Sequence, residues 1–224
     1  MTYLQECLNA HLLGGIILVD YFELLVLEPL PEHLMLVLGS LLISLLLSLP
    51  LSILCVKNKH LATVIIGFAN LIQAIPSFAV LALVVPLLGI GFTPALFAII
   101  LRMMLPIIKN TYIGLTTIDT KTLEYAKGLG LTDRQILFQI RFPNAYPSFF
   151  SGVKFAAILA NSLAILSAII GAGGFGVNVF KYIHQYNIQT LIYSIIPVIL
   201  IAIGLEITLM LVEKKLTPIP LRKG

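Results

Sequence analysis

Charged residues are scarce in this sequence. Asp, Glu, Lys and Arg make up 11% of its 224 residues, whereas they make up about a quarter of an ordinary soluble domain. Hydrophobic residues account for 59%, the mean hydropathy is +1.04, and the apolar residues gather in runs long enough to cross a bilayer. This composition argues against a soluble enzyme and predicts a single domain embedded in a membrane.

Potential metal ligands and nucleophiles are also few. The two cysteines, Cys7 and Cys55, lie far apart without a CxxC motif, and the four histidines have no ligand spacing. We therefore expect neither a disulfide framework nor a metal site. A nucleophile, a base and metal ligands do not cluster anywhere in the sequence, so we expect no catalytic residues and no enzymatic activity.

Lys and Arg are absent from the first 56 positions, and the first such residue is Lys57. A secretory signal peptide needs a basic n-region, so we expect the N-terminal segment to be retained. The formal net charge of +4 comes from Lys and Arg residues between apolar runs, without a continuous basic face. We therefore expect no nucleic-acid partner and interpret these residues as topology signals.

Five apolar segments are predicted to cross the membrane as helices, which makes the fold all-α. The first runs from His33 to Val56. Residues 60–101 contain no Asp, Glu, Lys or Arg and are too long for one helix, so Gly89–Pro94 should divide them into spans two and three. Span four is expected over Pro147–Ile170, and span five over Gln189–Val212.

The distribution of basic residues predicts the orientation, because Lys and Arg are enriched in cytoplasmic loops. With the N-terminus outside, the outer segments hold a single basic residue, Lys181. We therefore expect residues 1–32 on the outer side, a transmembrane domain over residues 33–212, and a cytoplasmic tail over residues 213–224.

The outer N-terminal segment has an apolar stretch between His11 and Leu27. Asp20 and Glu23 interrupt this stretch, and acids are costly in the middle of a membrane span. We therefore expect a helix that lies in the membrane interface, and a sixth span is the alternative.

The only substantial polar segment, residues 116–146, lies between spans three and four. It is predicted to form two short helices joined by a glycine turn. Asp119 should cap the first helix, which ends around Gly130. The second begins with the capping box Thr132–Gln135 and should end at Pro143. The alternative is a solvated loop that lies against the membrane.

The residues of this segment resemble a known motif. Glu124-Tyr125-Ala126 is followed by Gly130 and then by Ile140-Arg141-Phe142-Pro143. This spacing resembles the EAA loop of ABC importer permeases, which is E-A-A, three residues, G, nine residues, I, any residue, L-P. Tyr125 and Phe142 stand where Ala and Leu are usual.

In that family the loop forms a cytoplasmic coupling helix, which docks into a groove of an ATPase subunit. The resemblance therefore implies that an ATPase-coupling loop is formed by Glu124, Tyr125, Ala126, Gly130, Ile140 and Pro143.

Three further segments narrow the resemblance: Gln73–Ser77, Leu105–Tyr112 and Ile170–Gly176 are similar to the osmoprotectant branch of these permeases. The resemblance covers residues 35–212. It implies a five-span type I importer permease in the cell membrane. It also implies three kinds of partner, namely a second permease copy or homologue, ATP-binding cassette ATPase subunits and an extracytoplasmic substrate-binding protein.

The function implied is ATP-driven import of a quaternary-ammonium osmolyte such as glycine betaine, choline or carnitine. ATP and Mg would be bound by the partner ATPase, so we expect no cofactor in this chain. Two alternatives stay open: an ABC permease for another small polar solute such as an amino acid, and a secondary transporter.

Span four contains a ridge of small residues at four-residue intervals. The ridge consists of Gly152, Ala156, Ala160, Ala164 and Ala168. Small residues at this spacing let another helix approach closely. The ridge, with Asn161 and Ser162 beside it, is expected to pack either within the chain or at the dimer axis of the permease near the transport pathway.

Arg102 lies inside span three, where a charge facing lipid would be costly. It should therefore face protein, water or an interface, and Glu206 in span five is a possible partner. Both a structural role and a role in the pathway stay open. Pro76, Pro86 and Pro106 are expected to bend or interrupt spans two and three.

Overall fold

The computed structural model describes residues 22–217, which form helices joined by short turns, with no strand among them. Most of the interfacial helix expected over residues 11–27 lies outside the described residues. In chain order, with η for π- and 3-10 helices, the elements are η1 (Glu23–Leu27), α2 (Leu30–Lys57), α3 (Lys59–Ala74), α4 (Ser77–Leu88), α5 (Phe92–Thr116), α6 (Thr120–Gly128), α7 (Asp133–Gln135), η2 (Ile136–Arg141), α8 (Phe142–Leu166), η3 (Ser167–Ile170), α9 (Phe175–His184) and α10 (Ile188–Leu216). The all-α prediction is confirmed.

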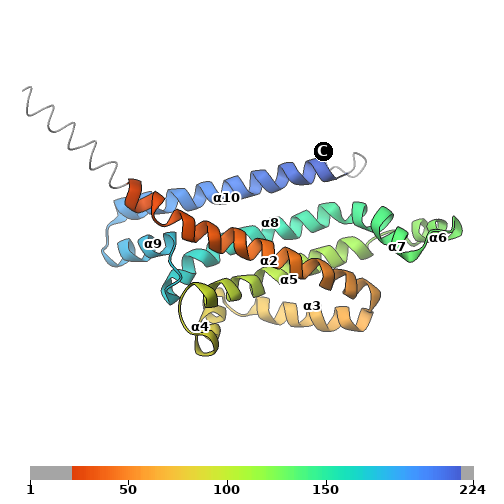
Figure 1. Cartoon of the computed structure of the whole chain (residues 1–224), viewed down its shortest axis with the longest axis horizontal. Coiled ribbons are helices and arrows are strands. Elements are labelled where there is room, and N and C mark those ends of the chain that lie inside the picture. Colours follow the sequence, from red (N-terminus) through yellow and green to blue (C-terminus); the bar gives the residue numbers. More distant parts are fainter. Residues whose placement is uncertain (1–21, 218–224) are drawn as a thin grey trace, which may run out of the picture.

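The long helices run side by side as an elongated bundle (Figure 1). One end carries α6, α7 and η2 and is called the loop end here; the far end carries η1 and α9. Four helical stretches are long and apolar enough to cross a membrane, and the bent pair α3–α4 makes a fifth if it counts as one span. These stretches include α2, α5, α8 and α10.

The second predicted span is broken into α3 and α4, with a bend of 104° between them. Pro76 stands at the break with an extended backbone, so the predicted interruption at this proline is confirmed. Pro86 and Pro106 instead lie inside α4 and α5.

Arg102 of α5 binds the end of α3 at this break. Its guanidinium donates hydrogen bonds to the carbonyl oxygens of Ile72 at 3.0 Å and Ile75 at 2.6 Å, and to the Ser77 hydroxyl at 3.2 Å. The Ile72 carbonyl also accepts a hydrogen bond from Ile75 N–H at 3.2 Å, whereas the Ile75 carbonyl lies past the end of α3. An unpaired backbone group is costly inside a bilayer. The charge therefore caps a broken helix, and the suggested pairing with Glu206 is not formed.

Helix α5 lies between α2 and α8. On the α2 side, Ser40, Ser44, Ser48 and Ser52 recur at four-residue intervals and are fully buried. The hydroxyls of Ser44 and Ser48 donate to backbone oxygens of α5, those of Ile100 and Met104, at 3.3 and 3.4 Å. The serine stripe therefore ties two membrane helices together through side chain to backbone contacts.

On the other side, α5 and α8 approach closely at two glycines. A Cβ atom at Gly152 would lie 2.8 Å from the Asn110 Cβ atom and 2.9 Å from the Pro106 carbonyl oxygen. A Cβ atom at Gly114 would lie 2.9 Å from the Cβ atom of Ser148. Neither position has room for a side chain.

The small-residue ridge of α8 is buried within this chain. Ala156, Ala160 and Ala164 are each 0% exposed, in one core with apolar residues of α2, α4 and α5. Ala168 lies in η3 and is partly buried. Of the two arrangements expected for the ridge, the structure shows packing within the chain.

Helix α8 starts earlier than predicted. Residues 133–170 form one continuous helical stretch, so the predictions that Pro143 ends the second loop helix and that span four starts at Pro147 are wrong. The N–H of Phe142 bonds to the Leu137 carbonyl, five residues back, in the π-turn of η2. Pro143 follows this wider turn at a first-turn position, where a missing N–H is tolerated.

The Arg102 cap gives the first prediction. The Arg102→Leu variant should leave the Ile75 carbonyl without its donor, at about 1–3 kcal/mol, while the Ile72 carbonyl keeps its hydrogen bond from Ile75 N–H. We expect a lower melting temperature in detergent, measured by size-exclusion chromatography after heating. Lys109→Leu is the control on the same helix, because Lys109 donates only to the exposed Asn70, at 3.3 Å. Equal melting temperatures for the two variants would contradict the cap.

The ridge gives the second prediction. Ala160→Leu adds bulk to a filled core, and overpacking costs about 1–3 kcal/mol. The matched control is Ser162→Leu, two residues further along the same helix at an exposed position. In the same heating assay, only Ala160→Leu should lose folded protein at a lower temperature. A larger loss in Ser162→Leu would show that the ridge is not tightly packed.

Candidate coupling site

Both helices of the polar loop begin with the predicted caps. The Asp119 carboxylate accepts a hydrogen bond from the backbone N–H of Lys121 at 3.3 Å. In the capping box, Thr132 N–H donates to the Gln135 side-chain oxygen at 2.8 Å, and Gln135 N–H donates to the Thr132 hydroxyl at 3.4 Å. Each cap satisfies backbone donors that the first turn of a helix leaves free.

The turn between the two loop helices depends on Gly130. Its φ of +82° lies in the left-handed region, which glycine adopts without strain. Gly130 N–H donates to the Lys127 carbonyl at 2.9 Å, and Leu131 N–H donates to the Ala126 carbonyl at 3.1 Å. This pair of hydrogen bonds is the Schellman motif, so α6 stops abruptly and the chain reverses in a defined geometry.

The predicted loop residues divide into an exposed and a buried set. Glu124, Tyr125 and Gly130 are exposed on α6 and its turn, and Tyr125 is 72% exposed. Leu129 at the same turn is 81% exposed, whereas Ala126 is buried. A tyrosine and a leucine at the tip of a polar loop form an apolar contact surface. Sequence reasoning did not single out Leu129 as part of this surface.

The loop is firmly attached to the bundle. Ile140 and Pro143 are half-buried where the loop continues into α8. Arg141 donates a hydrogen bond to the Leu115 carbonyl, in the last turn of α5, at 2.7 Å. An apolar cluster beneath the loop is formed by the buried residues Leu115, Leu137 and Ala145. The loop therefore moves with α5 and α8.

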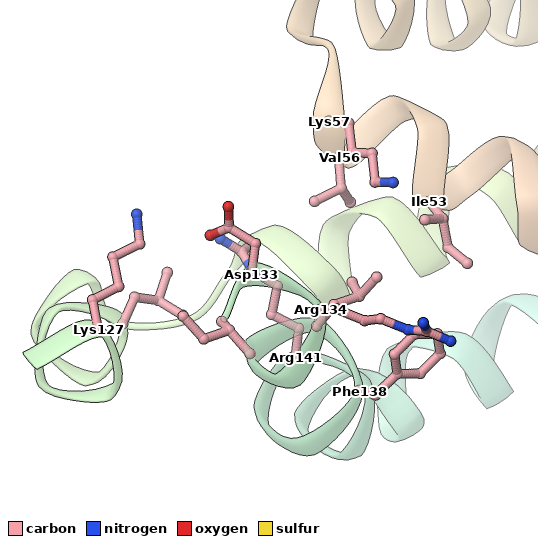
Figure 2. Close-up of a pocket in the computed structure, with 11 residues that line it drawn as sticks. Ile53, Val56, Lys57, Lys127, Asp133, Arg134, Phe138 and Arg141 are labelled. Carbon is pink, nitrogen blue, oxygen red and sulfur yellow. The ribbon is translucent and has the colours of Figure 1, made fainter. Parts of the chain in front are cut away.

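A cavity of about 840 Å³ lies between the loop and the end of α2. Figure 2 shows the side chains that surround it, which come from α2, α6, α7 and η2. Its charged lining consists of Lys57, Lys127, Arg134, Arg141 and one acid, Asp133. Sequence reasoning treated Lys57 only as a topology signal; its proximity to the loop is a tertiary contact that spacing does not reveal.

The far end of the bundle holds a second set of polar contacts. His33 Nε2 and the Asn161 side-chain oxygen lie 3.0 Å apart, and the Asn161 amide donates to the Val198 carbonyl at 3.2 Å. The Glu32 carboxylate accepts a hydrogen bond from Gly174 N–H at 2.9 Å. Asn161, beside the ridge, thus joins α2, α8 and α10.

The structure does not bring metal ligands together. Within residues 22–217, no three His, Cys, Asp or Glu side chains are grouped so that they could hold a metal ion. The Asn161 side chain contacts two protein groups, the His33 ring and the Val198 carbonyl.

Several proteins are similar in sequence over most of the chain. The carnitine transport permease protein OpuCB of Listeria monocytogenes is 31% identical, covering 86% of this chain and 88% of that protein. The choline transport system permease protein OpuBB of Bacillus subtilis is 35% identical, covering 84% and 86%. The osmoprotectant import permease protein OsmY of Salmonella typhimurium is 36% identical, covering 84% and 80%.

The fold also matches a solved structure. A chain of the inward-facing MetNI methionine ABC transporter superposes with a TM-score of 0.78 at 18% identity, covering 88% of this chain and 98% of that chain. At the sequence level, residues 40–218 match the family described as binding-protein-dependent transport system inner membrane component. The chain is therefore a member of this family of ABC importer permeases.

Proposed function

We propose that this chain is the membrane-spanning subunit of an ATP-driven importer for quaternary-ammonium osmolytes such as glycine betaine, choline or carnitine. The names of the relatives support the substrate class: similar permeases are named for carnitine, choline and osmoprotectants. The observation that supports coupling to an ATPase is the rigid loop, whose exposed tip carries Tyr125 and Leu129.

In this proposal the chain hydrolyses nothing itself. ATP and Mg are bound by the partner ATPase, which docks on Glu124, Tyr125 and the turn at Gly130. The motion of the ATPase then passes into the membrane through Arg141, because its bond to the Leu115 carbonyl joins the loop to α5. An external binding protein delivers the substrate at the far end.

A second permease copy or homologue completes the pathway in this proposal. Helix α10 is the least covered of the long helices, with 11% of its most apolar window buried. Its exposed apolar residues include Ile196, Leu200, Ile203 and Ile207. Lipid covers part of this surface, and the second permease copy covers the rest.

We further propose that the loop end faces the cytoplasm and the far end faces outward. The single basic residue expected outside, Lys181, lies in α9 at the far end. Lys57 and Lys127 lie at the loop end, in agreement with the positive-inside rule.

This orientation is tested with a new cysteine at Asn58, on a background in which Cys7 and Cys55 are replaced by Ala. Asn58 is exposed, between α2 and α3. A membrane-impermeant thiol reagent should label it in opened cells but not in intact cells. Labelling in intact cells would show that the proposed orientation is wrong.

Coupling is tested at the glycine turn. Gly130→Asp places a side chain at φ +82°, which costs about 1–2 kcal/mol and distorts the turn. We expect lower substrate uptake and less ATPase copurifying with the permease, while insertion in the membrane is unchanged. Gly130→Asn should be milder, because Asn tolerates this conformation better.

The matched control for Gly130→Asp is Gly128→Asp. Gly128 is exposed, has no positive φ, and a Cβ atom there would meet no atom within 4 Å. The two variants add the same charge two residues apart. If both reduce uptake equally, charge rather than turn geometry is responsible, and the coupling role of the turn is wrong.

The substrate class is tested with a reconstituted complex of this chain, its ATPase and its binding protein. Glycine betaine, choline or carnitine should stimulate ATP hydrolysis, and the chain alone should hydrolyse none. If only amino acids without a quaternary nitrogen stimulate the complex, the substrate assignment fails. The family assignment is unaffected by that result.

A further inference from the structure

The cavity between α2 and the loop has an excess of positive charge. Of its charged lining residues four are basic and one, Asp133, is acidic. Arg141 is used in binding the α5 carbonyl. Within the part of the chain that the structure describes, the charged groups of Lys57, Lys127 and Arg134 form no ion pair or hydrogen bond. Three cations with no acidic partner in the described chain make this cavity suited to an anion.

The cavity is also amphipathic. Its apolar lining includes Ile53 and Val56 in the last turns of α2, and Phe138 of η2, which is 53% exposed. On α2 the apolar surface continues away from the cavity through the exposed side chains of Leu46 and Leu42, which lie seven and eleven residues before Ile53 and therefore on the same helix face. An anion that also carries a hydrocarbon chain would therefore find contacts for both of its parts.

The position of the cavity matches the edge of a bilayer. Helix α2 is uncharged from Leu34 to Val56, and Lys57 is its last residue. Lys57 therefore marks the level at which the hydrocarbon region gives way to lipid headgroups. Basic pockets between helices at this level on the cytoplasmic side are suited to acidic lipid headgroups.

We propose that this cavity binds an acidic phospholipid of the inner leaflet. The phosphate of its headgroup lies among Lys57, Lys127 and Arg134, and its acyl chain lies along the apolar surface of α2. The lipid thereby bridges the end of span one and the coupling loop. The inference rests on the cytoplasmic orientation of the loop proposed above, and it adds a ligand site in the permease itself.

The experiment uses the permease with its ATPase, purified in mild detergent. Binding of short-chain phosphatidylglycerol is titrated by thermophoresis, with phosphatidylcholine of the same chain length as the neutral comparison. The test variant is Lys57→Gln/Arg134→Gln, in which both replaced side chains are exposed lining residues. The matched control is Lys59→Gln/Lys214→Gln, which removes two exposed cations that do not line the cavity.

The wild-type complex and the control should bind phosphatidylglycerol more tightly than phosphatidylcholine. The test variant should bind phosphatidylglycerol about 25-fold more weakly, at about fivefold for each cation removed. Equal losses in test and control variants would overturn the site. The measurement needs no transported substrate, so a wrong substrate class would leave its outcome unchanged. A wrong orientation would be detected separately, by the cysteine labelling at Asn58.

Two further arms separate the lipid from other occupants. Inorganic phosphate and glycerol 1-phosphate should compete with phosphatidylglycerol only weakly; if they bind as tightly as the lipid, the cavity is a site for free anions and the lipid assignment is wrong. The test variant should retain its ATPase during purification. Loss of the ATPase from this variant alone would show that the basic residues contact that subunit instead, and would overturn the proposal.

Discussion

The arrangement of the bundle depends on how one broken helix satisfies its backbone inside a membrane. The chain turns by 104° between α3 and α4, which leaves the Ile75 carbonyl without a helical partner. Arg102 supplies the missing donor from α5 at 2.6 Å and is 7% exposed. Because water is not available there, the bend and the arginine require each other. The charge fixes α3 and α4 to the helix that also contacts α2 and α8.

Helix α5 is held by different chemistry on each of its sides. Serine hydroxyls such as Ser44 bind its backbone from α2, whereas Gly152 of α8 lies directly against the Pro106 carbonyl and the Asn110 side chain of α5. Hydrocarbon side chains gain little by moving from lipid to another helix, so close packing and hydrogen bonds must hold the helices together. At the loop end, Arg141 adds a bond to the last turn of α5. The polar loop of residues 116–146 is thus an extension of α5 and α8.

Local sequence signals predicted local structure well. The capping box at Thr132, the left-handed Gly130 and the break at Pro76 follow from properties of a few adjacent residues. The partner of Arg102 was not predicted, because carbonyl groups of α3 become acceptors only once the helix is broken beside α5. The continuity of α8 through Pro143 was missed for another reason: the π-turn before the proline leaves no signal in residue type alone.

The two ends of the bundle are held by different kinds of contact. At the loop end, an apolar cluster, the Arg141 bond and the ion pair of Lys154 with Glu213 at 2.8 Å act together. At the far end, several contacts hold the glycine-rich turn and α9. Gly174 N–H donates to Glu32, Gly91 N–H donates to the Ile170 carbonyl at 2.7 Å, and the Asn178 amide donates to the Leu24 carbonyl at 3.1 Å. A single hydrogen bond contributes about 0.5–1.5 kcal/mol, or up to about 3 when one partner is charged. Force applied at the loop end would reach α5 through the Arg141 bond and α8 through the continuous helical stretch, so both helices would respond together.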